Sequence, residues 1–77
     1  DQKLYKYLIF NISKKDYERF KKSIPSQQSP TINNLADDKW ISVAIVVNSE
    51  SLWKYIDLIK DHKGKDIIIQ DLTMYIP

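Results

Sequence analysis

The chain has 77 residues, of which 12 are basic and 10 acidic, and its formal net charge is +2. This length corresponds to a single domain, residues 1–77, and the hydrophobic fraction of 43% predicts a folded core rather than a disordered chain. The absence of cysteine excludes disulfides, thiolate catalysis and cysteine-bound zinc, and it favours a reducing, cytoplasmic location.

The first apolar segment, residues 4–12, is rich in aliphatic and aromatic side chains and is typical of a central β-strand. Side chains alternate between the two sides of a strand. The segment therefore divides into two faces, Leu4, Leu8, Phe10 and Ile12 on one and Tyr5, Tyr7 and Ile9 on the other. We expect the first set to face the core.

A helix is predicted directly after this strand. Ser13 is a typical N-cap residue, since its hydroxyl can accept a hydrogen bond from the free backbone N–H of Asp16. The helix should run to about residue 23 and end before Ile24 and Pro25, because proline disfavours helix in the residue ahead of it.

The middle of the chain contains two candidate strands. Residues 40–47 alternate cleanly, with Ile41, Val43, Ile45 and Val47 on one face. Residues 31–35 are compatible with a short edge strand, and Asp37 and Asp38 indicate a turn between the two.

A second helix is predicted over residues 50–62, capped by Asn48 or Ser49. Gly64, the only glycine, follows this helix and is expected to adopt the left-handed conformation that often ends helices. The last strand begins near Ile67, and we leave open whether it continues past Asp71 to Ile76.

The order strand, helix, short strand, strand, helix, strand predicts an α+β fold, the ferredoxin-like βαββαβ sandwich. In that fold two helices pack on one face of a small, mainly antiparallel sheet. The alternative is a three-stranded βαβαβ arrangement that lacks the strand at residues 31–35.

No catalytic, cofactor or metal site is predicted. His62 is the only histidine and lies in a predicted last helical turn, where neither an orienting acid nor a nucleophile is expected beside it. Asp37 and Asp38 lack the spacing of a calcium loop, and Gly64 alone cannot form a glycine-rich phosphate loop. We therefore expect the chain not to be an enzyme.

Two surfaces are candidates for binding. The first is the sheet face turned away from the helices, where an aromatic and apolar group is expected to contact another protein: Tyr5, Tyr7, Ile9, Trp40 and Ala44. The second is a basic patch on the first helix: Lys14, Lys15, Arg19, Lys21 and Lys22. The alternatives are that the chain's own C-terminal segment covers the sheet face, and that the basic residues are merely solvated.

These patterns lead to the hypothesis of a non-enzymatic protein-binding module, an inhibitor, immunity-type or regulatory protein that acts through the aromatic face or as a homodimer. The expected partner is another protein or a second copy of the chain, with no membrane and no metal. The alternative is RNA or single-stranded nucleic-acid binding by the aromatic face and the basic helix. A third hypothesis is a small-ligand sensor that pairs through its sheet.

Overall fold

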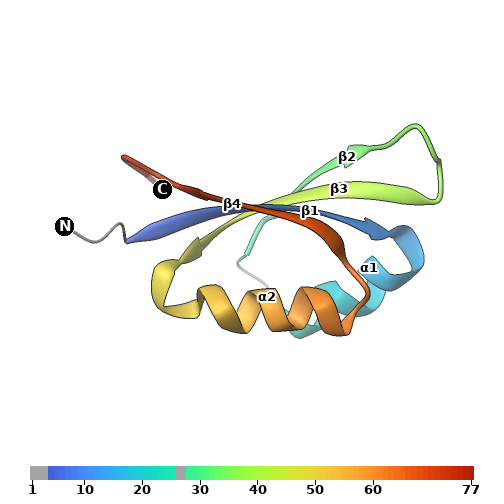
Figure 1. The fold of residues 1–77 in the computed structure, drawn as a ribbon, viewed down its shortest axis with the longest axis horizontal. Helices are drawn as coiled ribbons and strands as arrows, with labels where there is room; N and C mark the ends of the chain where they lie inside the picture. The colour runs from blue at the N-terminus through green and yellow to red at the C-terminus, as the bar shows by residue number, and fades with distance from the viewer. Residues whose placement is uncertain (1–3, 26–27) are drawn as a thin grey trace.

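The computed structural model describes residues 4–25 and 28–77. Figure 1 shows its six main elements in chain order: β1 (Tyr5–Ser13), α1 (Lys14–Phe20), β2 (Thr31–Asn34), β3 (Trp40–Asn48), α2 (Leu52–Asp61) and β4 (Lys65–Asp71). Short 3-10 turns at Lys21–Ser23 and Ser49–Ser51 extend α1 and precede α2.

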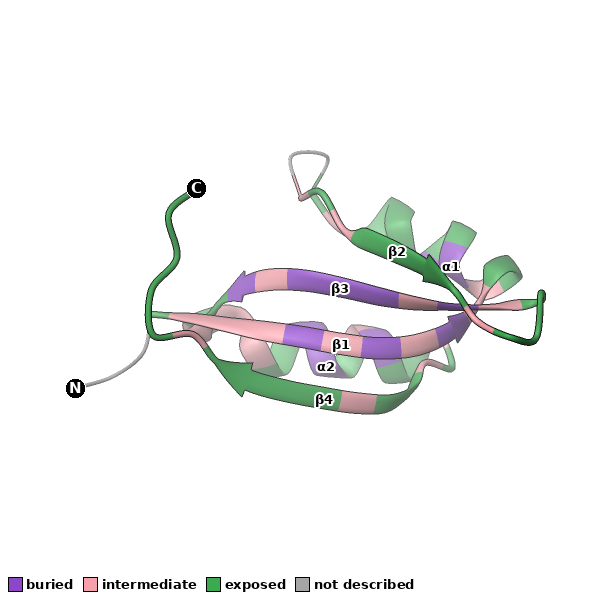
Figure 2. Ribbon diagram, turned by 90° about the horizontal axis from the view of Figure 1, so that it is seen from above, coloured by how far each residue is buried: buried purple, intermediate pink, exposed green. Residues whose placement is uncertain are grey.

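The four strands form one antiparallel sheet in the order β2-β3-β1-β4. Both helices lie on the same side of it (Figure 1), with α2 below β1 and β4 and α1 on the β2 side (Figure 2). The fold is the expected ferredoxin-like βαββαβ arrangement. The three-stranded alternative is wrong because β2 pairs with β3 from Thr31 opposite Ala44 to Asn34 opposite Ile41.

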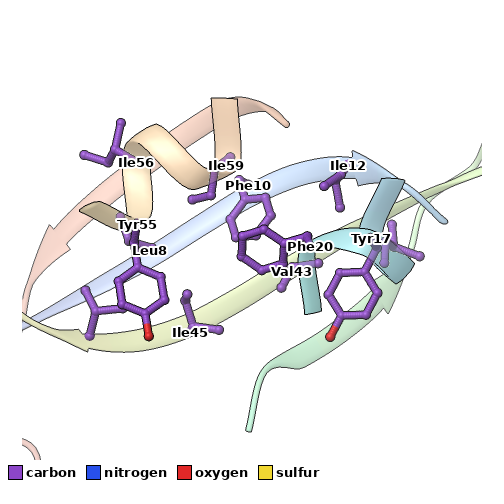
Figure 3. Close-up of a cluster of buried hydrophobic side chains, with 12 residues drawn as sticks. Leu8, Phe10, Ile12, Tyr17, Phe20, Val43, Ile45, Tyr55, Ile56 and Ile59 are labelled. Atoms are coloured by element: carbon purple, nitrogen blue, oxygen red, sulfur yellow. The ribbon is translucent and has the colours of Figure 1, made fainter. Parts of the chain in front are cut away.

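The core lies between the sheet and the helices, where the alternation of β1 and β3 predicted it. The prediction is wrong for Leu4, which precedes β1 and is 69% exposed. Leu8, Phe10 and Ile12 are fully buried on β1. The Phe10 ring meets Phe20 of α1 edge-on, with 5.3 Å between the ring centroids, and Ile59 of α2 belongs to the same buried cluster (Figure 3). One face of each central strand is thus covered by helices.

The start of α1 agrees with the sequence prediction. The Ser13 hydroxyl accepts a hydrogen bond of 3.0 Å from the Asp16 N–H. The helix follows β1 without a linker, and the Lys14 N–H donates to the Lys39 carbonyl, which ties it to the start of β3. This N-cap fixes where the chain leaves the sheet.

The end of α2 corrects the prediction for Gly64. The left-handed residue is Lys63, with φ of 65°, and Gly64 does not have a positive φ. Its role is spatial, because a Cβ at this position would overlap the Ile59 side chain and lie 3.0 Å from the Ile59 carbonyl oxygen. The Gly64 N–H donates to that same carbonyl at 2.8 Å, which requires the close approach.

The last strand begins two residues before Ile67 and ends at Asp71, so the continuation to Ile76 that we left open does not occur. β1 begins at Tyr5, and just past the end of β4 the Leu72 N–H donates a hydrogen bond of 3.4 Å to the Tyr5 carbonyl. Near its start β4 contains a bulge at Asp66, which has φ of 55° and accepts a hydrogen bond from the Asn11 amide.

The turn after α2 gives opposite predictions for two neighbouring residues. Gly64→Ala should lower the free energy of unfolding by about 1–3 kcal/mol, because Ile59 must move to admit the methyl group. Lys63→Gly should raise it or leave it unchanged, since glycine removes a left-handed strain of about 1 kcal/mol. Urea denaturation measures both, and a larger loss for Lys63→Gly than for Gly64→Ala would contradict this account.

Candidate functional site

The sheet face that lies opposite the helices, here called the open face, is built from rows of residues that cross the strands. One row is apolar over three strands: Ala44 of β3, Ile9 of β1 and Ile68 of β4 are paired neighbours, with Thr31 of β2 beside Ala44. The next row is polar and consists of Asn33 of β2, Ser42 of β3, Asn11 of β1 and Lys65 of β4. The apolar part of this face therefore lies toward the start of β1.

Tyrosines surround a hollow at that end. Tyr5 and Tyr7 line a depression of about 750 Å³ together with Thr31, Val46 and Tyr75. The rings of Tyr5 and Tyr75 are 5.0 Å apart, so the C-terminal segment covers this end of the face and forms one wall of the hollow. On the other side Gln28 donates a side-chain hydrogen bond of 2.7 Å to the Val46 carbonyl, beyond the point where β2 stops pairing with β3.

The opposite end of the open face carries Trp40. Its cross-strand neighbour is Ser13, whereas Tyr5 is opposite Asn48 at the far end of the same pair of strands. Eight residues of strand separate the two ends, which is roughly 26 Å. Lys65 extends over Trp40, with its ammonium nitrogen 4.5 Å from the ring centroid, and forms a cation–π contact.

The structure places all five predicted contact residues on the open face but does not bring them into one cluster. Tyr5, Tyr7 and Ile9 lie near the hollow, whereas Trp40 lies under Lys65 at the other end. Ala44 is only 8% exposed and so offers little contact surface.

Sequence reasoning missed Ile68 and Lys65, which complete this face. The two-residue period would have turned Ile68 away from Ile67 and Ile69, but only the pairing of Ile68 with Ile9 assigns it to the open face. Tyr75 belongs to the C-terminal segment that the alternative prediction placed over this face, and its ring contacts Tyr5 there.

The basic patch lies on α1 and, for Lys21 and Lys22, on the 3-10 turn that extends it, in the helical layer and away from the open face (Figure 1). Two of its members are paired within the helix, Arg19 with Asp16 and Lys21 with Glu18. The remaining three are exposed, and among the described residues they have no ion-pair partner: Lys14, Lys15 and Lys22. Two of the five positive charges of the patch are therefore offset locally.

Asp16 has the best-defined electrostatic environment on α1. Its carboxylate accepts a hydrogen bond of 2.9 Å from the Ser13 hydroxyl and a second from Arg19. The Ser13 bond, followed by the Arg19 bond and charge, holds the pKa of Asp16 below its ordinary value, although partial desolvation acts in the opposite direction.

The residues considered for catalysis have structural partners. Nδ1 of His62 lies 2.9 Å from the Leu58 carbonyl, and the imidazole meets Phe20 edge-on. Asp37 accepts a hydrogen bond from the Lys39 N–H and so shapes the turn before β3. Within residues 4–25 and 28–77, no three histidine, cysteine, aspartate or glutamate side chains lie together as a metal site requires. No helix in these ranges is long and apolar enough to cross a membrane.

Fold and surface together define a ferredoxin-like domain with a partly apolar open face. The same fold occurs in a functionally unknown protein from Pediococcus pentosaceus ATCC 25745, with a TM-score of 0.69 over 99% of both chains at 9% identity. Residues 3–74 match the family described as HisG, C-terminal domain, and the chain belongs to this family.

Relatives of similar sequence are longer proteins. A protein of Parabacteroides distasonis named ATP phosphoribosyltransferase is 31% identical over 71 residues, which are 92% of this chain and 25% of that protein. A protein of the same name from Prosthecochloris aestuarii is 32% identical over 53 residues, or 69% of this chain and 18% of the relative. The chain spans about a quarter of the length of the relatives that it matches most fully.

This membership corrects the functional hypothesis. The prediction of a non-enzymatic inhibitor, immunity-type or regulatory protein is wrong, as is the alternative of a nucleic-acid-binding module, because the relatives are named as enzymes. The expectation that the chain is not an enzyme is contradicted by the same finding. A domain that is one part of a longer enzyme can lack catalytic motifs, so their absence here was not informative.

The low pKa of Asp16 predicts a pH-dependent contribution to stability. A carboxyl whose native pKa is depressed stabilises the fold above its unfolded-state pKa, roughly 3.9, and this contribution is lost as pH falls through the native pKa. Asp16→Asn should therefore be less stable than the parent chain near pH 7, and the difference should shrink toward pH 2. Urea denaturation across this range measures it. A difference that does not vary with pH would contradict the assignment.

Proposed function

We propose that this chain is the C-terminal domain of an ATP phosphoribosyltransferase, an enzyme that transfers a phosphoribosyl group to ATP. The observation that carries the proposal is the family match over residues 3–74, supported by relatives with that name. A cytoplasmic location belongs to the same proposal, because ATP is an intracellular substrate.

The transfer chemistry is proposed to reside in other parts of the enzyme. Among the described residues, the one histidine is bound to a helix carbonyl, and the adjacent carboxylates Asp37 and Asp38 lie in an exposed turn. Phosphoryl and phosphoribosyl groups are usually held by glycine-rich loops or metal ions. Gly64 packs against Ile59, which leaves no glycine for such a loop in this chain.

The contribution of this domain is then assembly of the enzyme through the open face, with a second copy as the partner. In the apolar row, Ile9 and Ile68 give a centre that loses water on contact, and Tyr5 and Tyr7 give amphipathic side chains around it. The polar row through Ser42 and Asn11 would form its rim. Trp40 and the unpaired lysines of α1 remain predicted contacts outside this centre.

The activity is tested on the full-length gene product that carries this chain. It should transfer a phosphoribosyl group to ATP, whereas the 77-residue chain alone should show no turnover. A nucleotide assay that separates ATP from its phosphoribosylated product measures both. A full-length protein that neither binds ATP nor forms this product would overturn the assignment.

The assembly role is tested by substitution in the apolar row. Ile9→Lys should weaken self-association by about tenfold or more, since each copy would bury an unpaired ammonium group. Asn33→Lys is the matched control, because it adds the same charge to the same face in the polar row. Analytical ultracentrifugation measures association, and circular dichroism checks the fold. Equal effects of the two substitutions would place the contact elsewhere.

A further inference from the structure

The outer edge of β4 has no partner strand among the described residues. β4 is the last strand of the sheet and pairs only with β1, so one side of its backbone is free along Lys65–Asp71. Its middle carries Ile68, 52% exposed on the open face, and Ile69, 44% exposed on the helical face. An edge strand with exposed isoleucines on both faces is a template on which another strand can pair. Proteins usually protect such edges with charged side chains.

The helix beneath β1 and β4 also carries an exposed apolar residue. α2 lies below these two strands (Figure 2), and its Lys54, Tyr55 and Leu58 line a groove with the segment that follows α1. Trp53 is on the side of the helix away from that groove by the 3.6-residue period, and it is 70% exposed.

The other edge of the sheet has different chemistry. β2 has four residues, all exposed, and three of them are polar: Thr31, Asn33 and Asn34. Its one isoleucine, Ile32, is 45% exposed and faces the helical side opposite Val43. Of the two edges, only β4 combines length with a continuous apolar stretch.

We propose that β4 pairs in antiparallel fashion with β4 of a second copy, around a two-fold axis at Ile68, and so joins two sheets into one of eight strands. This contact uses the sheet edge, and it is additional to the open-face contact proposed above. The occupant is a second copy because the order of residues along β4 is complementary to itself.

Register is the first argument for self-pairing. Only residues on the same face can be opposite each other, so the axis must pass through one residue. With the axis at Ile68, Ile67 lies opposite Ile69 of the second copy and all three isoleucines meet isoleucine. An axis at Ile67 places Ile69 opposite Lys65, and an axis at Ile69 places Ile67 opposite Asp71. Both of those registers bury a charge against an apolar side chain.

Charge order is the second argument. β4 begins with a basic residue, Lys65, and ends with an acidic one, Asp71, which already pairs with Lys6. Antiparallel pairing brings the two unlike ends together, whereas parallel pairing places like charges side by side. The bulge at Asp66 turns Lys65 onto the open face, so it approaches the Asp71 of the second copy across the strand edge rather than in a close ion pair.

Single cysteines test the register, because the chain contains none of its own. Residues directly opposite in an antiparallel pair have Cα atoms about 4.5–5.5 Å apart, which is within disulfide range. Ile68→Cys should therefore cross-link to itself on mild oxidation. The Ile67→Cys and Ile69→Cys variants should each form no disulfide alone, but they should cross-link to each other when the two are mixed. Both residues lie on the helical side of the sheet, so an open-face contact cannot produce this disulfide.

A charge substitution with a matched control tests the energetic importance of the edge. Ile69→Lys should weaken self-association by about tenfold or more, because it places a charge among isoleucines twice in each pair. Ile32→Lys should leave association unchanged, since Ile32 is equally exposed on the helical side of the other edge strand. Analytical ultracentrifugation of the full chain measures both.

The outcomes separate this contact from the open-face contact. Self-linking of Ile68→Cys, linking of the mixed pair and a selective loss in Ile69→Lys support β4 pairing, even if Ile9→Lys proves harmless. Efficient self-linking of Ile69→Cys, or no linking at all in a chain that still associates, would overturn it. Equal losses in Ile69→Lys and Ile32→Lys would overturn it as well.

Discussion

The pairing of β1 with strands on both of its sides is the interaction on which the remaining structure depends. β1 lies between β3 and β4, and its buried side chains form the floor on which both helices pack. Phe10 is the meeting point: it contacts Phe20 of α1, and its ring is 3.4 Å from where a side chain on Gly64 would begin. A glycine after α2 is therefore needed for α2, β4 and the phenylalanine pair to close on the same strand.

The same alternation explains why the domain has a second surface. A strand that directs Leu8 and Phe10 to the helices must direct Tyr7 and Ile9 to the opposite side, where no helix covers them. An uncovered apolar face of this kind usually marks a contact surface. The assembly role proposed above rests on this arrangement together with the family membership.

The sequence predicted those features that depend on neighbours in the chain. The two-residue period separated the faces of β1 and β3, and the Ser13 hydroxyl three residues before a free N–H located the start of α1. The end of β4 and the role of Gly64 depend on contacts between distant segments, with Tyr5 and Ile59 respectively, which no local pattern contains. The function was mispredicted because catalytic motifs were sought in a segment that matches only a quarter of its relatives.

The position of β1 also affects the order in which the chain can fold. β1 is the first strand of the domain in chain order, yet its partners are β3 and β4, which follow much later. β4 is the last of the six elements. Only β2 and β3 are consecutive strands that can form a hairpin on their own. Closing the long loops between β1 and its partners costs chain entropy before any core contact compensates for it. We therefore expect the hairpin of β2 and β3 to be the earliest structure, and the core to form only when β1 and β4 join it.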